Sequence, residues 1–563
     1  MIALAVCASV FAFLWHFQRG DLLLDGDAVA HINIARRVFD SKTPGPLQLG
    51  TVWLPLPHVL IMPFIVSDWA WISGVGGSVP SLAAYVFAVW GIFRLTTRAL
   101  MPVSGEAEDR SPASRKSRDA GQPRASPETG QVANPFLGGL AALLFGLNPN
   151  LLYLQATAMT ESLYLALFIW AMIFFTEFAQ QREASPEHES RLFRKCGLGL
   201  MGAMLTRYDG WFLAAVLACA VVVLVWREAV QEAPVALQVK NPVAVTRPLS
   251  RISKFLIMVA AVPTFWLAYN WIVFGNPLEF ATGRYSARAI AQQSYDAGMH
   301  APGFHDLPTA TLYFLKTVQS DMGPGAWGKI WLLLAAAGAV LILARARKAW
   351  PLLMLWIPLP FYALSVAYEG ASIHVPQWWP FTYYNLRYGV QLIPAIAVFS
   401  AAAVYLAGQW LRSKWKVTPV VVMLIVLGGS YGSSWTDPIC LTEARVNSRS
   451  RIALETALAN VLSRLPRNST LLMYTGSHVG ALQRAGIPLR RVVTEGNHGD
   501  WKHPLARHGL WQEALDDPAR YADYAIGFDD DEVTMAARKK GLRTLTILET
   551  TGQAPATVYL TGR

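Results

Sequence analysis

The chain has 563 residues, of which 53% are hydrophobic and 15% are charged, and its formal net charge is +11. A soluble domain carries about 25% charged residues, so this composition excludes a single soluble enzyme. Four Cys residues provide no disulfide framework, which excludes a disulfide-stapled secreted module. The excess of Lys and Arg does not call for nucleic acid, because most of it flanks apolar segments. We therefore expect a polytopic membrane protein.

Long apolar runs fill the first 434 residues and predict eleven membrane helices. The expected spans are 1–17, 77–98, 134–153, 162–178, 195–208, 211–226, 254–274, 328–344, 351–368, 388–408 and 417–434. The apolar run 51–73 is not counted, because Pro55, Pro57 and Pro63 interrupt it. Its composition favours helices that lie in the membrane interface.

The distribution of Lys and Arg orients these spans. With the N-terminus in the cytoplasm, the basic stretch 102–134 becomes a cytoplasmic loop, as the positive-inside rule requires, and its composition predicts disorder. The regions 18–76, 275–327 and 369–387 and the tail 435–563 then face outside. We expect an integral protein of a bacterial inner or plasma membrane, with an extracytoplasmic C-terminal domain.

The tail predicts a soluble α/β domain, so we divide the chain into a membrane module, 1–434, and an extracytoplasmic domain, 435–563. Helices are expected at 451–465, 479–485 and 533–540, and strands at 470–474, 491–494, 524–527, 544–548 and 557–560. No internal repeat is evident.

The first outside region carries an acidic motif, Asp25-Gly-Asp27, followed by His31. Asp27 is expected to cap a helix, and His31 lies one turn later on the same face. Two carboxylates and an imidazole at a membrane surface suit a general base or a metal site. A capped amphipathic helix without chemistry is the other interpretation of this segment.

Further ionisable residues fall in turns on the same side of the membrane. Glu161 begins a span, Arg207 and Asp209 lie in a tight turn between two spans, and Arg387 opens another. Ionisable groups at membrane depth are costly and are functional candidates by default. A single Arg could instead be an anchor that snorkels to the interface. Together they predict an outward cavity lined by carboxylates and guanidinium groups.

These motifs as a set resemble the GT-C superfamily of polyprenyl-phosphate-dependent glycosyltransferases. Its members include protein O-mannosyltransferases, lipid A aminoarabinose transferases and the catalytic subunits of oligosaccharyltransferases. Besides the acidic motif, the similar features are Trp53-Leu-Pro-Leu-Pro-His58, Thr160-Glu161, Thr206-Arg207 before Trp211, Asn270 through Pro277, and Asn385-Leu-Arg-Tyr388. The resemblance covers about residues 1–434. The Asp-Gly-Asp motif replaces the Asp-Glu pair of the mannosyl and aminoarabinose enzymes, which leaves the acceptor class open.

The resemblance implies a membrane glycosyltransferase that moves a hexosyl or pentosyl group from a polyprenyl-phosphate donor to an acceptor hydroxyl, with inversion. The acceptor would be a lipid, glycan or protein. Asp27 would be the general base, assisted by Asp25. The residues expected to bind donor or acceptor are His31, His58, Glu161, Arg207, Asp209, Arg284, Tyr285, Arg387 and Tyr388.

Two points stay open. The sequence identifies no definite cofactor, but a divalent cation such as Mg or Mn, if present, would be held by Asp25, Asp27 and Glu161. The alternative functions are a transporter or lipid flippase, to which Pro-interrupted spans point, and an acid-lined scaffold whose tail binds cell-wall polymer. The concentration of ionisable residues at the outer face, rather than at mid-depth, favours the enzyme.

Overall fold

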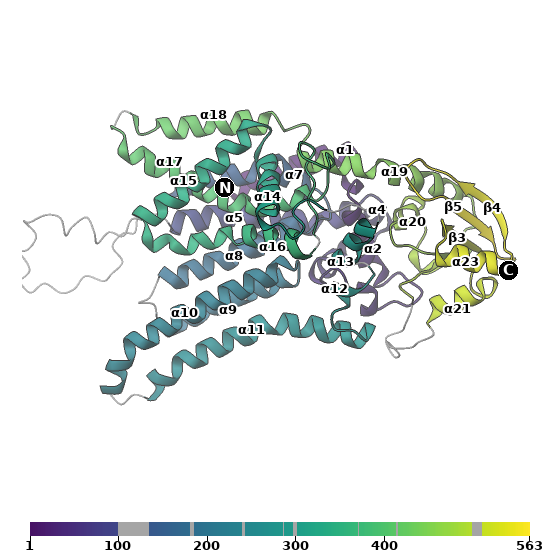
Figure 1. Cartoon of the computed structure of the whole chain (residues 1–563), viewed down its shortest axis with the longest axis horizontal. Coiled ribbons are helices and arrows are strands. Elements are labelled where there is room, and N and C mark those ends of the chain that lie inside the picture. Colours follow the sequence, from purple (N-terminus) through teal and green to yellow (C-terminus); the bar gives the residue numbers. More distant parts are fainter. Residues whose placement is uncertain are drawn as a thin grey trace, which may run out of the picture.

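The computed structural model describes residues 1–99, 134–180, 185–238, 242–284, 286–296, 301–369, 371–412, 415–497 and 509–562. Nearly all of the basic loop expected at 102–134 lies outside these residues, as does Tyr285. A helical bundle forms one part of the molecule and a small sheet forms the opposite end (Figure 1). The short helices of the first outside region lie between them (Figure 1).

Within the described ranges, seven helical segments are long and apolar enough to cross a membrane. They comprise α5 (Val75–Ala99), α8 (Glu161–Gln180), α10 (Asp209–Gln238), α11 (Pro242–Phe274), α15 (Ala326–Arg345), η5 (Arg347–Trp356) with α16 (Pro358–Leu364) and η6 (Ser365–Glu369), and η7 (Leu386–Leu392) with α17 (Ile393–Trp410). The helices α1 (Ile2–Gln18) and α18 (Thr418–Gly432) are apolar but shorter, and α9 (Pro186–Met204) begins with a charged half. The bundle is that of an integral membrane protein, although length and composition do not establish eleven spans.

One expected span is broken. We expected a single helix over 134–153, but α6 (Pro135–Gly146) and α7 (Pro149–Gln155) meet at a bend of 67°. The Asn148 side chain accepts hydrogen bonds from the backbone N–H groups of Asn150 and Leu151, at 3.0 and 3.1 Å. An Asn cap followed by Pro begins a new helix, so the preceding one cannot run through it.

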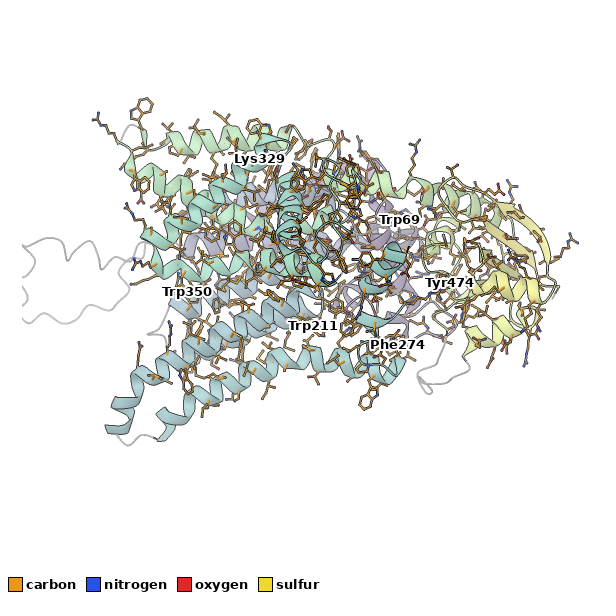
Figure 2. The ribbon with its side chains drawn as sticks, in the orientation of Figure 1. Trp69, Trp211, Phe274, Lys329, Trp350 and Tyr474 are labelled. Carbon is orange, nitrogen blue, oxygen red and sulfur yellow. The ribbon has the colours of Figure 1, made fainter. Side chains whose placement is uncertain are left out.

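The apolar run 51–73 is not a span, as expected. It folds into α3 (Leu56–Ile61), η3 (Met62–Phe64) and α4 (Asp68–Ile72). Trp71 is buried, whereas Trp69 is exposed. Trp69, Trp211 and Phe274 lie where the bundle meets the rest of the molecule (Figure 2). Aromatic rings with one wet and one apolar side favour such an interface.

The remaining helices outside the spans connect these parts. They are η1 (Asp21–Leu23), α2 (Gly26–Arg37), η2 (Pro46–Leu49), α12 (Glu279–Thr282), α13 (Ala287–Asp296) and α14 (Leu307–Met322). The alternative interpretation of α2 as an amphipathic surface helix does not hold, because α2 is buried on most sides, including Ala28, Ile32 and Ala35.

The C-terminal part is an α/β unit, as expected. Its sheet has the order β2-β1-β3-β5-β4, with β1 (Leu471–Met473), β2 (Val492–Val493), β3 (Tyr524–Phe528), β4 (Arg543–Leu548) and β5 (Ala556–Leu560). β1 pairs in parallel with β2 and β3, and β5 pairs antiparallel with β3 and β4. Its helices are α19 (Ile439–Leu462), α20 (Val479–Ala485), η9 (Leu489–Arg491), α21 (Leu510–Asp516), α22 (Pro518–Tyr521) and α23 (Glu532–Lys539).

The C-terminal part is fixed to the first outside region by specific hydrogen bonds. Buried Gln483 of α20 donates to the carbonyl oxygen of Trp71 at 2.6 Å and accepts from the Asn33 amide of α2 at 2.8 Å. Arg490 pairs with buried Asp40 at 3.0 Å. The tail therefore supports the segment that carries the acidic motif.

Candidate functional site

The two carboxylates of the acidic motif have different tasks. Asp25, not Asp27, is the N-cap of α2: its backbone is extended, and its Oδ1 accepts the Asp27 N–H at 2.9 Å. The expectation that Asp27 caps the helix was therefore wrong by two residues, because Gly26 already begins the helix. Asp27 instead lies in the first turn, where its carboxylate pairs with Arg387.

Arg387 joins three carboxylates from two distant parts of the chain. It lies in the first turn of η7, and besides Asp27 it contacts Asp25 at 3.6 Å and Glu161 at 3.4 Å. Only 14% of the Arg387 side chain is exposed. A guanidinium stays protonated under these conditions, so it compensates neighbouring carboxylates that would otherwise be costly to bury.

Glu161 links this group to a second arginine. Its fully buried carboxylate contacts Arg387 and also accepts from Arg207 at 3.0 Å. Arg207 further contacts Asp209 at 3.1 Å and the Tyr362 hydroxyl at 3.0 Å. A continuous chain of alternating acids and bases thus runs from the first outside region into the bundle.

The ring of Tyr388 contacts both guanidinium groups. Its ring centroid lies 5.5 Å from Cζ of Arg387 and 5.6 Å from Cζ of Arg207. An aromatic face attracts a cation, so the ring holds both groups in place while Glu161 neutralises them from one side. The expected convergence of the acidic motif with Arg207 and Arg387 is present in the structure.

His31 and His58 belong to the first outside region, which also carries the acidic motif. Both side chains are buried, and their ring nitrogens approach each other at 2.9 Å. Burial, aided by nearby Arg387, lowers the pKa of His31 to about 3, so its imidazole is neutral at pH 7. The contact fastens α2 to α3, and neither histidine lines the cavity described below.

Arg284 lies against the C-terminal part. It pairs with Glu532 of α23 at 3.2 Å, and its Cζ lies 5.0 Å from the ring centroid of Tyr474. Figure 2 shows Tyr474 in the sheet-bearing part of the molecule. Arg284 is also absent from the described lining of the cavity, so the structure does not bring it to the acidic motif.

A cavity of about 240 Å³ opens beside Asp27. Its walls come from the first turn of α2, the segment before η7, and α19. The lining residues are Leu24, Asp25, Gly26, Asp27, Tyr384, Asn385, Arg387, Glu443, Ala444, Asn447, Ser448 and Arg451. Asp27 is 35% exposed, whereas Asp25 is 15% exposed and Glu161 is fully buried. Asp27 is therefore the most accessible of the three carboxylates.

Sequence reasoning missed the α19 wall. We expected a helix from residue 451, but α19 begins at Ile439, directly after Pro438. Pro favours a helix start and would have been the signal for this boundary. Placing the start there puts Glu443, Asn447 and Arg451 on one face of a helix.

Glu443 caps the span that carries Arg387. Its carboxylate accepts the backbone N–H groups of Asn385 at 2.6 Å and Leu386 at 2.9 Å. Burial raises the pKa of Glu443 to about 7, while Arg387 opposes this increase and Asp25 adds to it. Burial likewise raises the pKa of Asp25.

The acidic residues do not fit a divalent cation. Within the described part of the chain, no group of three His, Cys, Asp or Glu side chains is arranged to hold a metal ion. Asp25, Asp27 and Glu161 each contact the Arg387 guanidinium, which supplies the positive charge among them. We therefore assign no chemical step to a metal.

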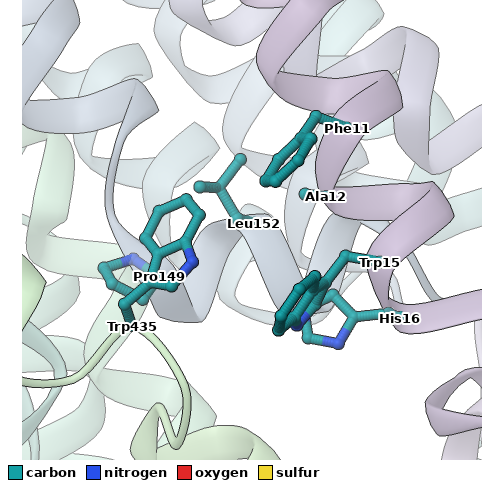
Figure 3. A pocket seen from close by; sticks show the side chains of 7 residues that line it. All are labelled: Phe11, Ala12, Trp15, His16, Pro149, Leu152 and Trp435. Atoms are coloured by element: carbon teal, nitrogen blue, oxygen red, sulfur yellow. The ribbon is translucent and has the colours of Figure 1, made fainter. Parts of the chain in front are cut away.

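A second hollow is too small for a ligand. It lies between α1, α7 and the segment after α18, and Phe11, Trp15, Leu152 and Trp435 are among its lining residues (Figure 3). Its volume of about 10 Å³ holds at most about one water molecule. His16 at its edge is already bonded to a carboxylate, at 3.0 Å.

The fold of the chain is similar to that of ArnT. The chain is similar to ArnT, an aminoarabinose transferase from Cupriavidus metallidurans, in the structure bound to undecaprenyl phosphate: the TM-score is 0.53 and the identity 13%, covering 100% of this chain and 98% of that one. The apo ArnT structure gives a TM-score of 0.51 and 12% identity, covering 99% and 97%. AglB, an oligosaccharyltransferase from Archaeoglobus fulgidus in complex with an inhibitory peptide and a dolichol-phosphate, gives 0.45 and 12%, covering 99% and 74%.

The likeness to ArnT confirms the GT-C resemblance at the level of the fold. It covers the whole chain, including the tail, whereas the sequence motifs cover only about residues 1–434. No protein-family model and no curated protein sequence matches the chain.

Proposed function

We propose that this protein is a membrane glycosyltransferase that moves a sugar from a polyprenyl-phosphate-linked donor to an acceptor hydroxyl. One observation carries the proposal: the acid–base chain that links Asp27, Arg387, Glu161 and Arg207 reaches a cavity at the end of the bundle. The fold supports it, because the similar ArnT structure is one bound to undecaprenyl phosphate.

In this mechanism Asp27 is the general base. Its carboxylate removes the proton from the acceptor hydroxyl, and the resulting oxygen attacks C1 of the donor sugar. The bond between C1 and the phosphate oxygen breaks, and the polyprenyl phosphate leaves with the electron pair. Attack from the face opposite the phosphate inverts the anomeric carbon. Its exposure to the cavity makes Asp27 better placed for this role than Asp25 or Glu161.

Arg387 would stabilise the departing phosphate. A planar guanidinium matches the geometry of phosphate oxygens and retains its charge as negative charge grows on the leaving group. When the phosphate of the sugar donor binds Arg387, it competes with the Asp27 carboxylate for the same guanidinium N–H groups. Binding of the sugar donor would therefore also release Asp27 to act as the base. Glu161 and Tyr388 would hold Arg387 and Arg207 in position.

We place the reaction on the extracytoplasmic side. The acid–base chain and the C-terminal part lie at one end of the bundle, and the positive-inside rule assigns the opposite end to the cytoplasm. The N-terminus would then be cytoplasmic. A lipid-linked donor suits this side, where nucleotide sugars are scarce.

A lipid flippase remains the second candidate, because the 67° bend between α6 and α7 is typical of the broken helices of transporters. Purified protein incubated with undecaprenyl phosphate that carries a radiolabelled sugar separates the two. We expect the labelled sugar to leave the lipid and to appear either as a water-soluble product or on the acceptor. Movement of intact donor between leaflets of proteoliposomes, without loss of label, would contradict the proposal.

A further inference from the structure

One wall of the cavity belongs to the C-terminal part of the chain. Glu443, Asn447 and Arg451 recur every four residues along α19 and line the cavity, together with Ala444 and Ser448. Residues four apart lie on the same face of a helix. This face of α19 and the first turn of α2 form walls of the same cavity.

The polar side chains of this wall are already held in place. Arg451 donates to the carbonyl oxygen of Leu24 at 2.7 Å, and Asn447 donates to that of Tyr383 at 3.0 Å. Glu443 accepts two backbone N–H groups at the start of η7. Polar groups fixed in this way lose little freedom when they bind a ligand.

The chemistry of the wall suits a sugar ring. The cavity presents a carboxylate, an amide, a hydroxyl and a guanidinium from α19, and the partly exposed ring of Tyr384 beside them. Sugar hydroxyls both donate and accept hydrogen bonds, so they require such a mixture, and an aromatic ring packs against the apolar face of a sugar. A polyprenyl chain requires a continuous apolar wall, whereas Leu24 and Ala444 are the only aliphatic side chains in the described lining.

The order of the chemical groups in the lipid-linked donor predicts which way its sugar extends from Arg387. A lipid-linked donor consists of an apolar chain, a phosphate and a sugar, in that order. Arg387 lies in the first turn of η7, which contacts α8 of the bundle as well as α19. If Arg387 holds the phosphate and the lipid extends along the bundle, the sugar extends towards α19.

We infer that α19 forms the sugar-recognition wall of the site, with Asn447 and Arg451 as hydrogen-bonding residues that select the donor sugar. The inference rests on the proposed function and deepens it. The C-terminal part then completes the active site instead of serving as an appended acceptor-binding module.

Asn447→Ala tests this inference. Asn460→Ala is the matched control, because Asn460 is exposed on the same helix and does not line the cavity. Both variants and the wild type are assayed with undecaprenyl phosphate that carries mannose, glucose or galactose, and with undecaprenyl phosphate alone. Loss of one hydrogen bond should raise KM for the preferred sugar-bearing donor about five- to tenfold in Asn447→Ala. Binding of bare undecaprenyl phosphate should be unchanged, and Asn460→Ala should match the wild type.

Three results would overturn the inference: wild-type KM in Asn447→Ala, an equal loss of affinity for bare undecaprenyl phosphate, or a change only in the acceptor KM. An unchanged melting temperature checks that the variant folds, and Asn447→Gln, which retains the amide, should recover part of the affinity. Failure of the proposed function is distinct, because the wild type itself would then neither bind undecaprenyl phosphate nor transfer sugar.

Discussion

Asp27 is the most exposed of the three carboxylates that contact Arg387, and it lines the cavity. Asp25 is occupied as a helix cap, and Glu161 is fully buried between two arginines. A base that must reach an acceptor requires accessibility, which Asp27 has. The distribution of tasks among the three carboxylates thus follows from burial and hydrogen bonding.

Asp27→Asn should therefore abolish transfer without unfolding the protein. An amide cannot remove the acceptor proton, and loss of a general base typically lowers the rate about 10²- to 10⁴-fold. Single-turnover transfer from a radiolabelled donor measures the effect. Asp530→Asn, at an exposed position in the C-terminal part, is the control and should retain full activity. Full activity of Asp27→Asn would refute the assignment of the base.

Arg387→Lys separates charge from geometry. Lysine keeps the charge but cannot hold a phosphate and several carboxylates with one planar group. We expect the transfer rate to fall about 10²-fold, as when one oxyanion donor is removed. Arg445→Lys, which alters another ion-paired arginine on α19, should have little effect. Equal loss in both variants would mean that Arg387 acts only in folding.

At the scale of single elements, Glu443 ties α19 to the span that carries Arg387. Burial raises its pKa to about 7 from the ordinary value of 4.5. The raised pKa means that the protonated carboxyl is favoured in the folded state. Its contribution to stability is therefore complete below about pH 4.5 and is lost as the pH rises to about 7.

Glu443→Gln removes this titration. The melting temperature of the wild type, relative to that of Glu443→Gln, should fall between about pH 5 and pH 7.5, by an amount equivalent to at most about 3 kcal/mol. If Glu443→Gln also weakens the cap of η7, the resulting loss of stability is the same at the lower and the higher pH. It therefore does not change how the difference between the two proteins varies with pH. Thermal unfolding in detergent measures the difference, and a difference that does not vary with pH would contradict the raised pKa.

Many of the helices and strands could be predicted one by one from the sequence. The strands of the tail, the helix Val479–Ala485 and the short helices of 51–73 follow from local pattern, turn residues and Pro. The break before Pro149 could not be predicted in this way, because the apolar run is continuous. The break depends on the Asn148 side chain, which caps the next helix. Similarly, α19 begins earlier than its apolar pattern indicates, since its first turns pack against the bundle: Cys440 N–H donates to Asn150 at 2.9 Å.

At the scale of the whole molecule, the C-terminal part holds the acidic segment against the bundle. Gln483 is the central contact, because it is buried and bonds both α2 and the end of α4. Gln483→Ala should lower the free energy of unfolding by about 1–3 kcal/mol, since it leaves buried partners unsatisfied. Transfer activity should fall with it. Gln512→Ala, at an exposed position, should change neither quantity; equal stabilities in thermal unfolding would refute this role.

The convergence of Asp27, Glu161, Arg207 and Arg387 was predictable, because the alternation of spans assigns all four to one end of the bundle. Their pairing was not, since it depends on how helices pack. The contribution of α19 was beyond sequence reasoning for the same reason: Glu443 and Asp27 are separated by hundreds of residues and meet only after the tail docks on the first outside region.

The most direct test is a structure of the protein with a polyprenyl phosphate bound. The account predicts a phosphate oxygen about 3 Å from the guanidinium of Arg387, the lipid chain along the bundle, and the Asp27 carboxylate turned to the cavity beside the phosphate. A phosphate bound elsewhere, with the Asp27–Arg387 pair intact, would contradict it.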